Sequence, residues 1–91
     1  MRWLPQRPVR SVITVEDTEA IVPEWTLGDR LRKARLLANL EQKDLAEAMG
    51  LSPSTIGTYE NDTTKPKLLV LKAWSAETGV PLVWLQNGEV Q

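Results

Sequence analysis

Residues 40–61 read LEQKDLAEAMGLSPSTIGTYEN, and this stretch decides the fold. Its apolar residues recur at the three- and four-residue spacing of a helix, and Gly50 interrupts them midway. A first helix is predicted to begin near Gln42 and to end at Gly50. A second helix is predicted to follow at once, because Ser52 is a favourable N-cap and Pro53 suits the first helical position. The residues expected to face inward are Leu45, Ala46, Met49, Ile56 and Tyr59. The stretch therefore predicts two short helices joined by a tight turn, which is a helix-turn-helix unit.

A longer helix is predicted before this unit. Thr26 and Asp29 form a capping pair at its start, and Asn39 can adopt the left-handed conformation that ends a helix. The apolar face between these two points consists of Leu27, Leu31, Ala34 and Ala38.

Two further helices are predicted after the unit. A polar loop over residues 62–66 leads into a helix over residues 67–78, which Gly79 ends. This helix is expected to bury Leu68, Leu71 and Trp74. A last short helix opens at Pro81 and contains Trp84 and Leu85. The predicted fold class is therefore all-α, with five helices in a domain over residues 26–88.

The first 25 residues are predicted to form an irregular arm outside the core. Three prolines break any helix there, and residues 11–15 are a short β-branched run of strand character. The basic residues of the arm are Arg2, Arg7 and Arg10. They suit entry into a DNA minor groove, and the alternative is a disordered tail or one that binds a protein partner.

Composition favours a binding protein over an enzyme. The 91 residues suffice for one domain, and they include neither Cys nor His. The chain therefore has no disulfide framework, no thiolate or imidazole metal site and no histidine general base, and no cofactor is expected. No apolar run is long enough for a signal peptide or a bilayer span, so no membrane partner is expected and the predicted location is the cytoplasm.

The charge distribution limits how the chain could bind a nucleic acid. The formal net charge is −1, and no segment is basic overall: residues 1–25 carry three basic and four acidic groups, residues 26–66 six and six, and residues 67–91 two and two. Proteins that bind DNA usually neutralise phosphates with a basic surface. If this chain binds DNA, neutral donors, backbone amides and a few placed cations must take over that role.

The motif residues resemble a known family. Leu40, Gln42, Leu45, Ala46, Gly50, Ser52, Ser54, Thr55, Ile56, Glu60 and Pro66 stand in the order and spacing of the phage repressor and Cro helix-turn-helix family, also called XRE-like. Gly79, Val80, Leu82, Trp84, Leu85 and Gly88 resemble the closing segment of that family. The resemblance covers about residues 26–88. It implies a five-helix, lambda-repressor-like domain that binds a two-fold operator as a dimer and represses by blocking RNA polymerase.

The resemblance also implies roles for individual residues. The helix over residues 52–61 would enter the major groove, with base-reading positions at Pro53, Ser54 and Thr58. Thr55, one of the outward polar residues of this helix, is predicted to read bases with them. Gln42 and Asn61 match phosphate-contacting positions. Lys43 and Lys65 flank the motif and are further candidates for phosphate contact. Arg35 and Glu60 match an ion pair between two helices, which gives that pair a structural role.

Two acidic residues depart from the family pattern. Glu41 replaces the usual Ser or Thr cap of the first motif helix and puts a carboxylate near the expected phosphate path. Asp62 stands where Gly is common and adds another negative charge near the DNA side. Pro53, which has no side-chain donor, can offer only apolar contact, for instance to a thymine methyl group.

Several features also have a plain structural explanation. The outward polar residues of the second motif helix would look the same on an ordinary surface helix. Arg30, Arg32 and Lys33 read as a solvated face, though one of them could reach a phosphate. Leu69 and Val70, with Trp84 and Leu85 nearby, exceed what one helix face needs; this surplus is explained by core packing or by a dimer face.

The function predicted is a sequence-specific, double-stranded DNA-binding transcriptional regulator of a phage or bacterium, more specifically a repressor or Cro-type protein. One alternative is an antitoxin that regulates its own promoter and also binds a toxin. The other is a protein-interaction domain that has lost DNA binding. No catalytic constellation is present in the sequence.

Overall fold

The computed structural model describes residues 24–89, so the arm at residues 1–23, with its three arginines and its strand-like run, lies outside the described residues. Within residues 24–89 the chain forms five α-helices and no strand. They are α2 (Leu27–Leu37), α3 (Gln42–Met49), α4 (Pro53–Glu60), α5 (Leu68–Thr78) and α6 (Leu82–Asn87). The predicted all-α class and the five helices are confirmed.

The ends of α2 follow from its capping residues. Thr26 Oγ1 accepts a hydrogen bond from the Asp29 backbone N–H (3.1 Å), and Asp29 Oδ2 accepts one from the Thr26 N–H (3.0 Å). This reciprocal capping box satisfies two backbone donors that would otherwise lack partners. Asn39, just beyond the helix, has a φ of 61°, which is the left-handed conformation that the sequence predicts.

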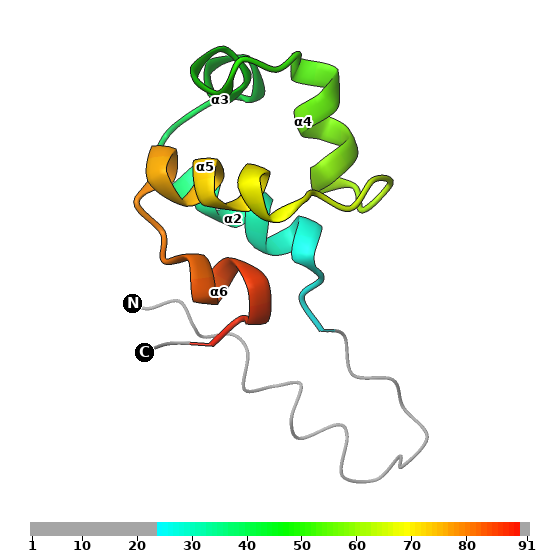
Figure 1. Cartoon of the computed structure of the whole chain (residues 1–91), viewed down its shortest axis with the longest axis vertical. Helices are drawn as coiled ribbons and strands as arrows, with labels where there is room; N and C mark the ends of the chain where they lie inside the picture. The colour runs from blue at the N-terminus through cyan, green and yellow to red at the C-terminus, as the bar shows by residue number, and fades with distance from the viewer. Residues whose placement is uncertain (1–23, 90–91) are drawn as a thin grey trace, which may run out of the picture.

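The predicted helix-turn-helix unit is present as α3 and α4. Gly50 ends α3 with a φ of 73°, a conformation that glycine adopts without strain. Ser52 then caps α4, since its Oγ accepts from the Thr55 N–H at 3.2 Å, and Pro53 occupies the first turn. The turn between the helices therefore spans three residues, 50–52, and the direction of the chain changes sharply there (Figure 1).

The last two helices form as predicted except for one residue. Gly79 and Gly88 end α5 and α6 in left-handed conformations. Leu68 was expected to be buried, but half of its surface (50%) is exposed, because it is the first residue of α5 and lies before the turns that pack on the core. Met49 is likewise only partly buried at the edge of the core.

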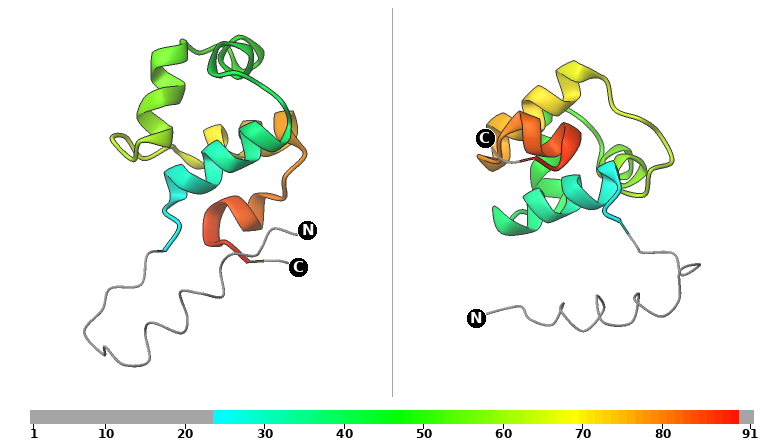
Figure 2. Two further views of the ribbon diagram at one scale, coloured as in Figure 1. Left: turned by 180° about the vertical axis from the view of Figure 1, so that it is seen from behind. Right: turned by 90° about the horizontal axis from the view of Figure 1, so that it is seen from below.

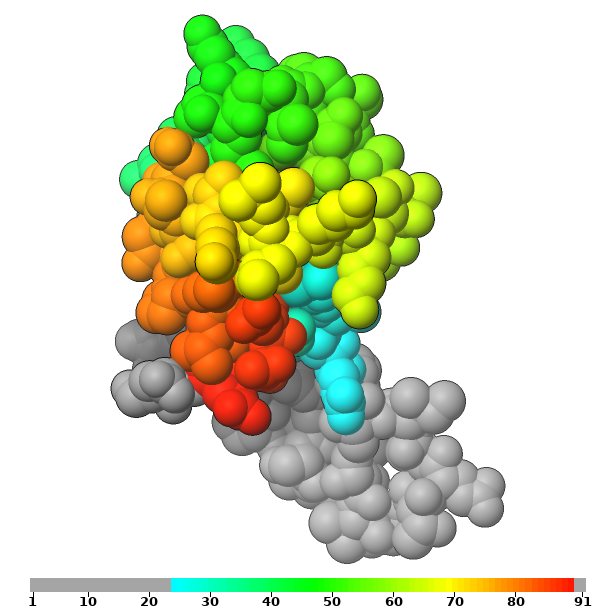
Figure 3. Space-filling view, viewed as in Figure 1, coloured from blue at the N-terminus to red at the C-terminus, as the bar shows by residue number. Residues whose placement is uncertain are grey.

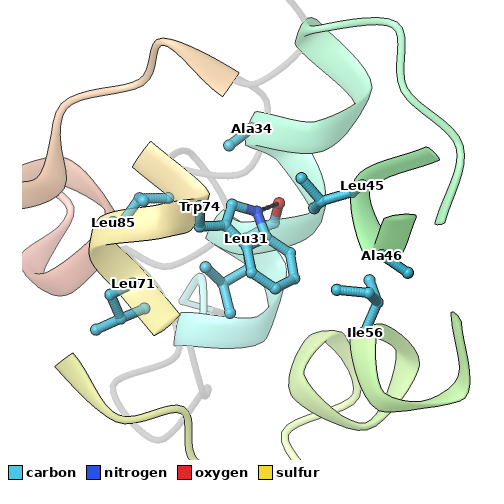
Figure 4. Packing of buried hydrophobic residues seen from close by; sticks show 8 residues of the cluster. All are labelled: Leu31, Ala34, Leu45, Ala46, Ile56, Leu71, Trp74 and Leu85. Atoms are coloured by element: carbon cyan, nitrogen blue, oxygen red, sulfur yellow. Dashed lines mark hydrogen bonds between the residues drawn. The ribbon is translucent and has the colours of Figure 1, made fainter. Parts of the chain in front are cut away.

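The core is built around Trp74. Its indole Nε1–H donates a hydrogen bond to the Leu31 carbonyl (3.0 Å), which provides a partner for the polar atom of a side chain with no exposed surface (Figure 4). The Tyr59 ring meets the Trp74 ring edge to face, with centroids 6.3 Å apart. The buried hydrophobic residues are Leu31, Ala34, Leu45, Ala46, Ile56, Leu71, Trp74 and Leu85. Each of the five helices contributes at least one of them.

The arrangement puts the motif at one end of the described region. Helices α3 and α4 lie at that end, α6 lies at the other, and α2 and α5 lie between them (Figures 1 and 2). In the space-filling view, α5 crosses the front of the molecule below α3 and α4 (Figure 3). Because α2 and α5 hold the inner faces of the motif, the outer face of α4 remains at the surface.

Candidate nucleic-acid interface

The outer face of α4 carries small polar residues. Ser54 and Asn61 are exposed and Thr58 is half-buried, while Ile56 and Glu60 point inward and are buried. Positions 54, 58 and 61 lie one and two helical turns apart, so they share a face. No side chain on this face is longer than Asn, and a binding partner can therefore approach the helix axis closely.

Gly57 lies on that face and has no side chain. A methyl group placed at its Cα would meet only the side-chain amide of Gln42, at 3.8 and 4.0 Å, which is ordinary van der Waals contact. The fold itself therefore has room for a methyl group at this position. The absence of one leaves a shallow surface between Ser54 and Thr58.

The hydroxyl groups of α4 have local partners. Thr58 Oγ1 donates to the Thr55 carbonyl (2.8 Å), so its oxygen remains available as an acceptor and its methyl group as an apolar contact. Ser52 Oγ lies 3.1 Å from Ser54 Oγ and 2.8 Å from Thr55 Oγ1. Thr55 thus belongs to the cap of α4, whereas Ser54 and Pro53 are exposed beside it.

Three side chains lock the motif onto α2. Arg35 donates from Nε to Glu60 Oε2 (2.6 Å) and from Nη2 to Glu60 Oε1 (3.0 Å), and both residues are buried, with 7% and 6% of their surface exposed. Gln42 Nε2 donates to the same Glu60 Oε1 at 3.1 Å. The carboxylate of Glu60 therefore connects α4 with α2 and α3: it accepts two hydrogen bonds from Arg35 on α2 and one from Gln42 on α3.

The other candidate phosphate-contacting residues lie at the surface. Asn61 is the exposed C-cap residue of α4, and Lys43 and Lys65 are exposed. Glu41 is also exposed, and its Oε1 lies 3.9 Å from Lys43 Nζ. A pair this open to water contributes little stability, but the two charges largely cancel at a distance.

The sequence that forms these helices is similar to sequences of other proteins. A family model described as helix-turn-helix matches residues 31–85. The chain belongs to the helix-turn-helix family. The matched segment begins at Leu31 and ends at Leu85, the first and last fully buried leucines, so the helix-turn-helix match covers the whole core.

Two named relatives carry the same kind of domain. An uncharacterized HTH-type transcriptional regulator of Archaeoglobus fulgidus is 47% identical over 52 residues, which cover 57% of this chain and 23% of the relative. The HTH-type transcriptional regulator PrtR of Pseudomonas aeruginosa is 34% identical over 73 residues, which cover 80% of this chain and 28% of the relative. The helix-turn-helix chain described here thus spans about a quarter of the length of these relatives. No solved structure matches it.

Asp62 has a role in this helix-turn-helix domain that sequence reasoning missed. Its Oδ1 accepts from the Gly28 N–H (2.9 Å), and its Oδ2 accepts from Thr26 Oγ1 (2.6 Å). The carboxylate therefore sits at the amino end of α2, where the helix dipole favours a negative charge. Asp62 thus ties the loop after α4 to the start of α2.

Arg30 was also assigned wrongly as part of a solvated face. Its guanidinium donates to three backbone carbonyls: those of Leu85 (2.8 Å), Gln86 (2.8 Å) and Trp25 (3.1 Å). The Trp25 and Trp84 rings meet edge to face beside it, with centroids 6.3 Å apart. No local sequence pattern predicts the contact between Arg30 and the Leu85 carbonyl, because the two residues are 55 positions apart.

Within residues 24–89 none of the helices combines the length and the apolar composition that crossing a bilayer requires.

Proposed function

We propose that this chain is a DNA-binding transcriptional regulator that inserts α4 into the major groove of duplex DNA. One observation carries the proposal: the exposed face of α4 consists of short polar side chains around a glycine, in the second helix of a helix-turn-helix unit. An α-helix fits the major groove, and its side chains then reach the base edges. The names of both relatives support the regulatory role.

Base reading is assigned to the outer face of α4. Ser54 and Thr58 would contact base edges by hydrogen bonds, and Thr58 adds a methyl group that suits thymine. Pro53 would make apolar contact alone. Thr55 lies at the margin of this surface, because its hydroxyl already contacts Ser52.

Phosphate contact is assigned to residues on either side of that surface. Gln42 and Asn61 would donate from neutral amides, and Lys43 and Lys65 would supply charge. Because Glu41 offsets Lys43, few positive charges remain to release counterions. We therefore expect affinity to depend less steeply on salt than it does for strongly basic DNA-binding proteins.

The proposal includes a homodimer that acts as a repressor of the phage or Cro type. Leu69 is 78% exposed and Leu68 50% exposed on the first turn of α5, whereas Val70 and Trp84 pack against the core and Leu85 is buried. On α5, the apolar surface available for a second copy thus consists of these two leucines. The proposed location is beside DNA in the cytoplasm, and the proposed role is binding without catalysis.

Selection of bound sequences from a random pool of duplexes tests this function. The expected product is an inverted repeat whose half-site centres lie about 34 Å apart, one turn of DNA. Enrichment of a single unrepeated site, bound by one protomer, would contradict the dimer. Failure to enrich any sequence, together with capture of a protein partner, would favour an interaction domain that has lost DNA binding.

A further inference from the structure

A polar groove of about 650 Å³ lies where the motif meets α2. It opens between α2, the first residue of α3 and the residues that end α4. Its lining residues are Asp29, Arg32, Arg35, Gln42, Glu60, Asn61 and Asp62. Two of these, Gln42 and Asn61, are the neutral residues assigned to phosphate contact, so the groove joins them.

The charged side chains of this groove have described partners, with one exception. Arg35 and Glu60 neutralise each other in the buried pair. Asp29 and Asp62 accept hydrogen bonds from uncharged donors at the amino end of α2, so both carboxylate charges remain in the lining. Arg32 is exposed, and within residues 24–89 it forms neither a hydrogen bond nor an ion pair. Its guanidinium is therefore the one charge of the groove lining without a described partner.

The two neighbouring cations of α2 cannot take its place. Arg30 is held by three carbonyls near α6. Lys33 does not line this groove; it lines an adjoining hollow with Trp25 and Leu36, which Asp29 and Arg32 line as well. Among the basic residues on α2 that have no described partner, Arg32 alone lines the groove together with Gln42 and Asn61.

We propose that this groove receives a phosphate of the DNA backbone and that Arg32 supplies its cation. The planar guanidinium can present two parallel N–H groups to phosphate oxygens. Gln42 adds the second N–H of its amide, since the first is bonded to Glu60, and Asn61 adds its exposed amide. Arg32 is thus a positioning residue that fixes the domain on the backbone while α4 reads the bases. This inference rests on the proposed function.

Salt titration of Arg32→Gln against Lys33→Gln gives the first test. Each neutralised phosphate contributes about 0.9 to the slope of log affinity against log salt. Arg32→Gln is expected to flatten the slope by about that amount on selected and scrambled duplexes alike, and Arg32→Lys to restore it. Lys33→Gln, which removes the same charge one residue away, is expected to leave it nearly unchanged. Equal flattening by both Gln variants would overturn the proposal, because it would show a long-range charge effect.

Neutralising single phosphates of the selected duplex gives the second test. Methylphosphonate is placed at one backbone position at a time, and wild type and Arg32→Gln are titrated against each duplex. We expect one backbone position per half-site at which the methylphosphonate weakens binding by wild type. At that position it should not weaken binding by Arg32→Gln any further, because the variant already lacks the contact. Identical scans for the two proteins would overturn the groove assignment while leaving the proposed function intact. If wild type binds no duplex in a salt-dependent way, both the function and this site are wrong. Inorganic phosphate is expected not to compete at millimolar concentration, and competition would show a general anion site instead.

Discussion

The side-chain amide of Gln42 donates a hydrogen bond to Glu60 Oε1 (3.1 Å), and so the first residue of α3 is joined to the last residue of α4. Glu60 also receives two hydrogen bonds from Arg35 on α2. The angle between the two motif helices is therefore held by one buried carboxylate as well as by the turn at Gly50. A change at Glu60 would affect all three helices together.

Glu60→Ala is expected to destabilise the domain strongly, because it leaves the Arg35 charge buried without a partner. Loss of one member of a buried ion pair costs about 3–5 kcal/mol, which is comparable with the whole stability of a small domain. The melting temperature should fall by more than about 12 °C, or the protein should not fold. Glu47→Ala is the matched control, since Glu47 is an exposed residue within α3. Equal melting temperatures for wild type and Glu60→Ala would show that the pair contributes nothing.

Gly57→Ala separates DNA approach from folding. Its new methyl group meets only the Gln42 amide at van der Waals distance, and alanine is favoured over glycine in a helix by up to about 1 kcal/mol, so the melting temperature should hold or rise. Operator binding should weaken by about 1–3 kcal/mol, the value of one base contact, because α4 can no longer approach as closely. Thermal melts and duplex titrations measure the two effects.

Gly28→Ala is a control for Gly57→Ala, because it should affect folding rather than DNA contact. A methyl group there would collide with the backbone carbonyl of Glu60. This variant should lose stability, with any loss of DNA binding following from unfolding. If Gly57→Ala bound the operator as tightly as wild type, close insertion of α4 would be refuted.

Ser54→Ala and Thr58→Ala should reduce sequence preference, whereas Asn61→Ala should reduce affinity for all duplexes. The first two are expected to weaken binding to the selected operator by about 1–3 kcal/mol and to relax preference at one or two positions per half-site. Asn61→Ala is expected to weaken operator and scrambled duplexes about equally, because phosphate contacts carry no sequence information. Titrations against both duplexes provide the comparison. Full operator preference in the Ser54 and Thr58 variants would mean that α4 is not the reading helix.

Leu69→Glu tests the proposed dimer face. Leu69 is 78% exposed, so the variant should keep its melting temperature, while a charge placed on an apolar contact should shift sedimentation toward the monomer. Binding to an inverted repeat should then lose cooperativity between half-sites. Leu37→Glu, at another exposed leucine on α2, serves as the control. An unchanged sedimentation profile beside a dimeric wild type would move the interface elsewhere.

Local signals in the sequence predicted the helices well. Thr26, Asn39, Gly50 and Ser52 each set a helix boundary through groups within a few residues, and the structure has all four in the predicted roles. The fold class and the motif could therefore be inferred from periodicity and capping alone. The family resemblance added the pairing of Arg35 with Glu60.

The contacts that sequence reasoning missed join distant segments. Gln42 and Glu60 are 18 residues apart, Gly28 and Asp62 are 34 apart, and Arg30 and Leu85 are 55 apart. Each depends on how the helices pack, which neither helical periodicity nor capping rules specify. Asp62 shows the consequence most clearly: the sequence predicts only its negative charge, and the fold adds its hydrogen bonds to the amino end of another helix.

The contact between Arg30 and α6 has a consequence for synthesis on the ribosome. Helix α2 emerges early, but Leu85, which completes the core beside it, follows 55 residues after Arg30. At about 5–20 residues per second, this delay lasts about 3–11 seconds. During this delay, the surface of α2 that Leu85 later covers is exposed to water and to chaperones. The nascent chain is therefore expected to fold late and in one step, when its last short helix becomes available.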